Sequence, residues 1–352
     1  MKKALFVALA LAALGLAGPA GAATYQVAVG EIARPPAGTP DMATLNQFFP
    51  SRLVIHAGDK VTFTNFGFHT VTYVKGGGAA PLFMPDGSKY AALNDAAGTP
   101  FGFSSLDKLI YNVPAFLPTG GKVIDGSKTV SSGVIEGPTE NKPGKITFTF
   151  PKAGTYKLIC LVHGPMMSAT VVVKPKAALV ASPRTVAKTA ASQTAAAWRA
   201  IKVLDAAAKP PANTVWAGLG NKGTIMGFYP KRLTVKAGTT VRFVLKAPME
   251  IHDVAFGPAD YMEQLMKSTD LFPESPTGTN QVTPLIVYGT DPGKAGVYDG
   301  ANHGNGFYVS PLLGTAPGMV KEFSITFTKP GTFHYLCLIH GPDMSGDIVV
   351  TS

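Results

Sequence analysis

Apolar and polar residues alternate along much of this chain, and an alternation with a period of two predicts β-strands. In KITFTF (145–150) and EFSITF (322–327) every second residue is apolar. RLVIHAGDKVTFTN (52–65) and RLTVKAGTTVRFVL (232–245) each predict two short strands around an Ala-Gly turn. Short strands with regular turn signals, in a chain with 39 glycines and 29 prolines, favour β-sandwiches over a helical fold.

The same pattern occurs twice. FFPSRLVIHAGDKVTFTN, from Phe48, matches FYPKRLTVKAGTTVRFVL, from Phe228, and the segments around the two cysteines match over nearly thirty residues. A repeat on this scale indicates two copies of one domain. We therefore expect an all-β protein with tandem sandwich domains at residues 24–175 and 212–352.

The intervening segment, 176–211, has a different composition. It is rich in alanine, Ser182 is a good N-cap, Pro183 suits the first helical position, and prolines at 210 and 211 would end a helix. The apolar residues that would share one face are Trp198, Ile201 and Leu204. We predict a helical connector that docks on a domain, with a membrane-surface or partner-binding helix as the alternative.

The N-terminus has the features of an export signal. Residues 1–23 comprise a basic start, a short apolar run and small residues suited to cleavage. No later segment is long and apolar enough to span a bilayer. We expect a mature protein that is periplasmic or otherwise exported and has no transmembrane segment.

The chain contains only two cysteines, Cys160 and Cys337, in the matching stretches CLVHGPMM and CLIHGPDM. In an oxidising compartment the default for two cysteines is a disulfide. Each cysteine ends a predicted core strand and faces inward, and the following loop returns a histidine and then a methionine. These residues are His163 and Met167 in the first copy and His340 and Met344 in the second.

Thiolate, imidazole and thioether form a soft ligand set that favours copper. Each copy also offers a second imidazole after the strand that follows the Ala-Gly turn. The predicted copper ligands are thus His69, Cys160, His163 and Met167 in the first copy, and His252, Cys337, His340 and Met344 in the second. This is the ligand set of a blue-copper centre, with one copper per copy. Met166 is the alternative to Met167 as the axial ligand.

At these residues the chain resembles the cupredoxins, such as plastocyanin, azurin and amicyanin. The resemblance rests on an early histidine at a strand end and on the motif G-T-[YF]-x-x-x-C-x-x-H-x-x-x-M in both copies. It implies Greek-key sandwiches, type 1 copper and electron transfer. The spacing from the first histidine to the cysteine, 91 residues in one copy and 85 in the other, is longer than in small cupredoxins. Each copy therefore carries a long insertion, of a kind that usually has a function.

The resemblance also implies that the electron leaves through the histidine after the cysteine. The surrounding patch would then contain Leu161, Gly164, Pro165 and Met166 in the first copy, and Leu338, Gly341, Pro342 and Asp343 in the second. We expect these small apolar patches to dock redox protein partners weakly. The net charge of +10 falls to +8 when Lys2 and Lys3 leave with the signal. This charge indicates either a solvated basic surface or attraction to acidic redox partners or an anionic membrane surface. Nucleic acid is not expected as a partner.

Copper enzymes and copper-storage proteins are the alternatives. Multicopper oxidases and copper nitrite reductases add catalytic copper through further histidines, one of them beside the ligand cysteine. Here Ile159 and Leu336 occupy that place, and the chain has no His-x-His pair. The three remaining histidines, His56, His303 and His334, are predicted to lie on the surface. A storage protein would favour dense methionine or histidine clusters, which are absent from the sequence.

Overall fold

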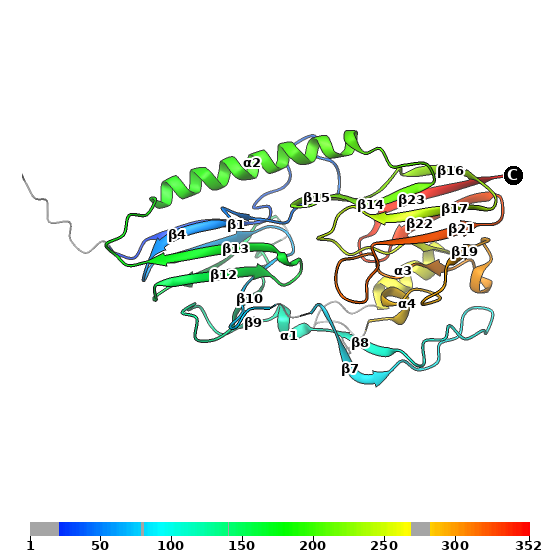
Figure 1. Cartoon of the computed structure of the whole chain (residues 1–352), viewed down its shortest axis with the longest axis horizontal. Helices are drawn as coiled ribbons and strands as arrows, with labels where there is room; N and C mark the ends of the chain where they lie inside the picture. The colour runs from blue at the N-terminus through cyan, green and yellow to red at the C-terminus, as the bar shows by residue number, and fades with distance from the viewer. Residues whose placement is uncertain (1–20, 79–80, 140, 269–281) are drawn as a thin grey trace, which may run out of the picture.

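The computed structural model describes residues 21–78, 81–139, 141–268 and 282–352. The predicted signal peptide, residues 1–23, falls outside these ranges except for its last three residues. Figure 1 shows two β-rich halves side by side, with α2 running along both. No helix among the described residues has the length and hydropathy needed to cross a membrane.

The first half is a sandwich of two sheets, as predicted. The smaller sheet has the order β11 (Gly144–Thr149), β5 (Lys60–Asn65), β1 (Thr24–Val29), β3 (Phe48–Phe49). The larger has the order β4 (Arg52–His56), β13 (Gly164–Lys174), β12 (Gly154–Cys160), β6 (Thr70–Tyr73), β10 (Val130–Val134), β9 (Pro118–Thr119). The parallel pairs β1–β5 and β4–β13 show that the chain crosses repeatedly between the sheets.

The second half repeats this arrangement. One sheet has the order β19 (Gly296–Tyr298), β21 (Glu322–Phe327), β17 (Thr239–Leu245), β14 (Thr214–Gly220), β15 (Gly223–Tyr229), β2 (Ala43–Leu45). The other has the order β16 (Arg232–Lys236), β23 (Gly341–Thr351), β22 (Gly331–Cys337), β18 (Ala255–Phe256), β20 (Tyr308–Val309). The strand β2 belongs to the first copy in sequence, but it pairs with β15 of the second.

The alternating residues form the cores. Val61, Phe63 and Phe148 are fully buried, and the rings of Phe63 and Phe148 meet edge to face with centroids 6.0 Å apart. The two strands around each Ala-Gly turn, such as β4 and β5, lie in opposite sheets. The turn therefore connects the two layers of the sandwich.

The connector forms α2 (Pro183–Ala207), and the Ser182 side chain caps its N-terminus by accepting a hydrogen bond from the Thr185 amide. Trp198 and Ile201 are buried, as the sequence predicts for the apolar face of the helix. They pack in one cluster with Ala28, Leu45 and Phe49 of the first copy and Leu219 and Ile225 of the second. The helix therefore docks on both halves.

The long insertion of the first copy contains β7 (Phe83–Lys89), β8 (Asp107–Tyr111) and α1 (Val113–Phe116). The insertion of the second contains α3 (Ala259–Ser268), α4 (Pro284–Val287) and the short 3₁₀ helix η1 (Asn302–Gly304). Figure 1 shows β7 and β8, in cyan, beneath the second half near α4. One buried cluster combines aromatic side chains of the first insertion with apolar side chains of the second copy, including Phe101, Phe103, Leu285, Ile286 and Leu336.

Polar contacts reinforce this packing. The Tyr90 hydroxyl donates to the carbonyl of Val282 at 2.5 Å. His303 Nδ1 lies 3.0 Å from Asp95 Oδ2, and the His303 ring packs on Phe101. The His303 side chain is only 14% exposed, so its expected surface position is wrong. It lies in the contact between the two copies because the first insertion covers it.

Candidate metal centres

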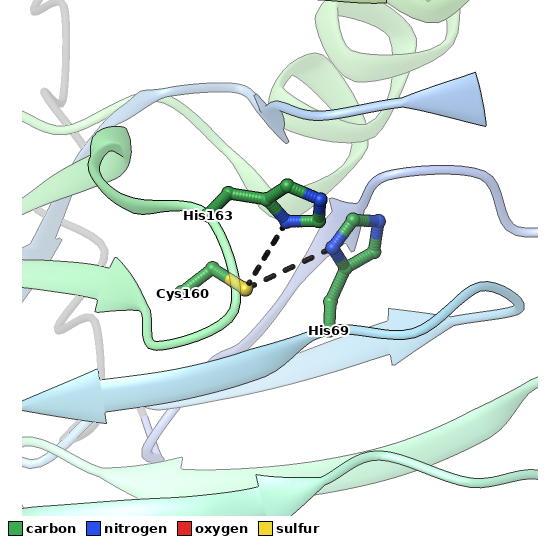
Figure 2. A group of neighbouring side chains, drawn as sticks. All are labelled: His69, Cys160 and His163. Carbon is green, nitrogen blue, oxygen red and sulfur yellow. Dashed lines mark hydrogen bonds between the residues drawn. The ribbon is translucent and has the colours of Figure 1, made fainter. Parts of the chain in front are cut away.

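The first centre forms where the hairpin of β12 and β13 turns. Cys160 is the last residue of β12, and Gly164 begins β13 with a φ of +63°, which permits the tight reversal between them. This turn brings His163 back over the cysteine, and His69 approaches from the position just before β6 (Thr70–Tyr73) (Figure 2). Cys160 Sγ lies 3.6 Å from His163 Nδ1 and 3.8 Å from His69 Nδ1.

The second centre has the same construction at the end of β22. Cys337 Sγ lies 3.5 Å from His340 Nδ1, which in turn is 3.2 Å from His252 Nδ1. In each centre the ligand atoms of the cysteine and both histidines lie within 4.8 Å of one another. Both cysteines are free and buried in separate sandwich cores, which excludes the disulfide alternative.

The predicted axial methionines lie in the same cores as their cysteines. Met167 and Met344 are both fully buried, each in the same core cluster as the cysteine of its centre. Met166, the alternative, has an exposure of 45%. The structure thus brings the two histidines and the cysteine of each copy together and buries one methionine in the same core.

In each centre, a glycine packs against the ring of the first ligand histidine, His69 or His252. His69 Nε2 and His252 Nε2 are buried and have no hydrogen-bond partner among the described residues. A Cβ atom on Gly30 would collide with His69 Nε2, and one on Gly218 would lie 2.8 Å from His252 Nε2. Both glycines have a positive φ, of +65° and +68°. Each ring therefore packs directly against the glycine backbone, with its Nδ1 directed towards the other ligands of its centre.

The two centres differ beside the sulfur. In the first, the Thr70 amide donates to Cys160 Sγ at 3.4 Å, and the Thr70 hydroxyl accepts from the Leu161 amide at 2.8 Å. In the second, Asp253 replaces the threonine, and its Oδ1 accepts from the Leu338 amide at 2.6 Å. Asp253 Oδ2 is buried without a hydrogen-bond partner in the described part of the chain. A neutral hydroxyl in one copy thus corresponds to a buried carboxyl in the other.

This difference gives the two cysteine thiols different pKa values when no metal is bound. Burial acts to raise the pKa of the Cys160 thiol, but hydrogen bonds with His163 and His69 outweigh it and the pKa falls well below its usual value. Burial, followed by the charge of Asp253, raises the pKa of Cys337 well above its usual value. Burial also raises the pKa of Asp253 to about 7. The first centre thus favours a thiolate before metal arrives, whereas the second favours a neutral thiol.

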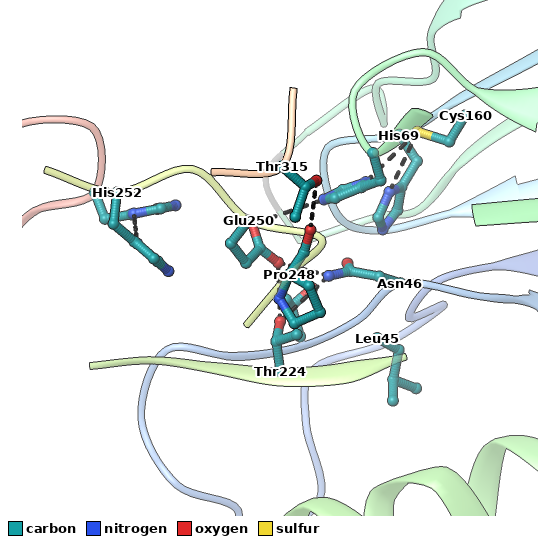
Figure 3. A network of polar contacts seen from close by, with 12 residues as sticks. Leu45, Asn46, His69, Cys160, Thr224, Pro248, Glu250, His252 and Thr315 are labelled. Carbon is teal, nitrogen blue, oxygen red and sulfur yellow. Dashed lines mark hydrogen bonds and ion pairs between the residues drawn. The ribbon is translucent and has the colours of Figure 1, made fainter. Parts of the chain in front are cut away.

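A buried carboxylate lies between the centres. Glu250 Oε2 is 3.8 Å from His163 Nε2, and both side chains are only 8% exposed. Glu250 Oε1 accepts hydrogen bonds from Asn46 Nδ2 at 2.5 Å and from Thr224 Oγ1 at 2.9 Å. Figure 3 shows Glu250 between His252 on one side and His69 with Cys160 on the other.

Sequence reasoning missed Glu250, and the repeat contained a signal for it. The residue two places before the first ligand histidine is Gly67 in one copy and Glu250 in the other. An acidic residue in the apolar stretch PMEIHDV is unusual, because a buried carboxylate requires partners. The same comparison would have drawn attention to Asp253 opposite Thr70.

The expected exit patches are only partly at the surface. Leu161 and Leu338 are buried, with exposures of 6% and 5%, whereas Pro165 and Met166 are exposed. The prediction that both leucines face a docking partner is therefore wrong. For Leu338 the cause is the other copy, because this side chain lies in the cluster shared with the first insertion. The ring of His163 likewise faces Glu250 of the second copy.

The three other histidines do not gather into a further site. His56 lies 2.8 Å from the carbonyl oxygen of Ala178, and His303 pairs with Asp95. His334 points away from Cys337, as its position on the strand predicts, and lies 3.0 Å from Asp347 Oδ1. Among the described residues, only the two centres above group three or more potential ligands.

The donor sets fit copper. Two imidazole nitrogens and a cysteine sulfur converge in each centre, a soft set of the kind that copper prefers, and the cysteine and the first histidine of each set are buried. Nε2 of His69 and of His252 faces the glycine backbone and has no hydrogen-bond partner among the described residues, so Nδ1 is the nitrogen that can bind a metal. The two centres therefore fit two copper ions per chain.

Protein-family models and curated protein sequences give no match to the chain. Three solved cupredoxins are similar to part of it. The Cu(I) form of an amicyanin mutant is 18% identical, with 42% of this chain and 90% of that chain covered and a TM-score of 0.22. Auracyanin A, a blue copper protein from Chloroflexus aurantiacus, is 20% identical, with coverage of 41% and 100% and a TM-score of 0.24.

The third is a purple cupredoxin from Nitrosopumilus maritimus, 15% identical, with 40% of this chain and all of that chain covered and a TM-score of 0.22. Each alignment covers a length of this chain close to that of one sandwich. The evidence for what the two centres do comes from their own side chains.

Proposed function

We propose that the protein is an exported electron carrier of the cupredoxin type with two type 1 copper centres, one in each sandwich. The observation that carries this proposal is the pair of buried Cys–His–His groups, each with a buried methionine in the same core. The proposed ligands are His69, Cys160, His163 and Met167, and His252, Cys337, His340 and Met344. Copper, when bound, supplies a one-electron redox couple.

The side chains of this protein prepare the sites for that couple. The Gly30 and Gly218 backbones hold the outer rings in one orientation, so the donors need little rearrangement when the oxidation state changes. The Thr70 amide donates to the first sulfur, and hydrogen bonds to a ligand sulfur tune the potential of such a centre. Asp253 gives the second sulfur a different neighbour, so the two potentials should differ.

An electron carrier is favoured over a copper oxidoreductase because the remaining histidines have other partners. His56, His303 and His334 contact a carbonyl, a buried aspartate and a surface aspartate in three separate places. None of them extends either centre into a cluster. The partners of such a carrier would be redox proteins, and the excess of basic residues suits acidic ones.

Copper content and the visible spectrum test the proposal. The purified, oxidised protein should bind two coppers per chain and show an intense thiolate-to-copper absorption that reduction abolishes. Cys160→Ser and Cys337→Ser should each remove one copper and the corresponding part of the absorption. A copper signal that survives in the double variant would instead indicate a different kind of site, and a colourless protein would refute type 1 centres.

A further inference from the structure

The two centres are joined by a short loop of the second copy. This loop follows β17 and turns at Ala247, whose carbonyl accepts from the Glu250 amide at 2.9 Å. Met249, with an exposure of 5%, packs into the core cluster of the first sandwich. The loop therefore extends from the second sandwich into the first, and then returns to the ligand His252.

Every polar group identified around the Glu250 carboxylate is a donor. Asn46 presents its amide nitrogen and Thr224 its hydroxyl, while His163 presents Nε2. When Nδ1 of His163 binds metal, Nε2 carries a proton and can only donate. A group that only accepts fits this environment, whereas a carboxamide would set a donor against one of these donors.

The carboxylate also shortens the path between the metal sites. His163 is a proposed ligand of the first centre, and the gap from its Nε2 to Glu250 Oε2 is 3.8 Å. From Glu250 the covalent chain reaches His252, a proposed ligand of the second centre, after only Ile251. His252 Nδ1 is in turn 3.2 Å from Nδ1 of His340, the other histidine of the second centre.

The low exposure of His163 argues against a carrier with two independent centres. In a carrier with two independent centres, the histidine after each cysteine would face solvent, where a partner could reach it. Here the His163 side chain is 8% exposed and is directed at the second copy. The ring edge from which an electron would leave therefore faces the other centre.

We propose that Glu250 is a positioning residue that holds His163 towards the second centre, so that the two centres exchange one electron within the same chain. This inference rests on the proposed function. With copper bound, one electron would pass from the reduced centre to the oxidised one, with no bond formed or broken. Partners then need to contact only one centre, and the chain acts as a two-site relay.

Glu250→Gln tests this role, because it keeps the shape of the side chain and places a donor against the ring or against Asn46 and Thr224. Glu31→Gln is the matched control. The carboxylate of Glu31 also acts on His163, but it belongs to the first copy and accepts from the Leu45 amide at 3.1 Å. The rate of electron exchange is measured after rapid reduction of a small fraction of the copper in the oxidised protein.

In the native protein, the exchange rate should not depend on protein concentration. Glu250→Gln should retain two coppers and both absorption bands but slow the exchange by about tenfold, the lower range for loss of a partner around a ligand histidine. Glu31→Gln should stay within about twofold of the native rate, since it leaves that partner in place. A native rate proportional to concentration, or a Glu250→Gln rate equal to the native one, would overturn the proposal.

Nuclear magnetic resonance of the copper-free protein separates this inference from the proposed function. Histidine labelled with ¹⁵N reports the Nε2 of His163 directly, without any metal. Glu250→Gln should shift this resonance and Glu31→Gln should shift it less. An unchanged resonance would show that Glu250 does not hold the ring, even if both blue centres are present. A native protein that lacks the blue centres would refute the proposed function, whatever the resonance shows.

Discussion

Asp253→Asn should remove a pH-dependent loss of stability from the copper-free protein. Asp253 is completely buried, its Oδ1 accepts from the Leu338 amide, and its Oδ2 has no hydrogen-bond partner in the described part of the chain. Burial raises its pKa from 3.8 to about 7. The folded protein therefore keeps the proton over a pH range in which the unfolded chain has already released it.

The sign and size follow from this difference. Because the pKa of Asp253 is higher in the folded protein than in the unfolded chain, the folded protein binds more protons between these two pKa values. The free energy of unfolding therefore falls as the pH rises from about 4 to about 7. At 1.36 kcal/mol per unit, the full penalty above pH 7 is about 4 kcal/mol. Between pH 5 and pH 8 the native protein should lose about 3 kcal/mol relative to Asp253→Asn.

Urea unfolding of the reduced, copper-free proteins at pH 5 and pH 8 measures this difference. Asp343→Asn is the control, because Asp343 is an exposed carboxylate near the start of β23, shortly after the same cysteine. Its stability should follow that of the native protein within about 0.5 kcal/mol at both pH values, as is usual for surface substitutions. If native and Asp253→Asn proteins show the same pH dependence, the buried carboxyl is not strained and the reasoning fails.

Two further predictions concern the packing of Gly218 against His252 and the docking of α2. Gly218→Ala should lower copper affinity at the second centre by about 10–100-fold in a chelator competition, because the new Cβ would clash with Ala247 Cβ at 2.5 Å and with His252 Nε2 at 2.8 Å and so displace the ring. Gly238 has a similar positive φ, but an added Cβ there would meet no other atom. An equal loss of copper affinity in Gly238→Ala would therefore refute the role of the contact between Gly218 and His252. Trp198→Ala should destabilise the copper-free protein by about 3–5 kcal/mol in urea unfolding. Val203→Ala, at a 62% exposed position of the same helix, should change stability by under about 0.5 kcal/mol, and a similar loss in both variants would contradict the docking of α2.

The sequence predicts the parts of this fold that depend on local spacing. Period-two alternation and a repeat identify the strands, and a turn of three residues necessarily returns His163 to Cys160. The interior position of both cysteines follows from the same alternation and is confirmed. Ser182 and the apolar face of the connector likewise predict α2, because helix caps and faces are set by nearby residues.

Contacts between the copies could not be predicted in this way. An apolar pattern shows that Phe103 or Leu45 is buried but not against what, since burial is nearly indifferent to the identity of the apolar partner. The pairing of β2 with β15 and the position of Glu250 both result from how two complete sandwiches meet. These contacts also explain why the expected surface positions of His303 and Leu338 are wrong.

The insertion that covers the second half also constrains the order in which this chain can mature. Phe101, Phe103 and Tyr111 are synthesised early, but much of the apolar cluster that buries them lies beyond residue 250. Domains generally fold in the order in which they are made, yet this apolar layer must wait for the second half to arrive. Until then an aromatic surface stays open to the wrong partner, so assembly of the native protein depends on keeping the first half apart from other copies.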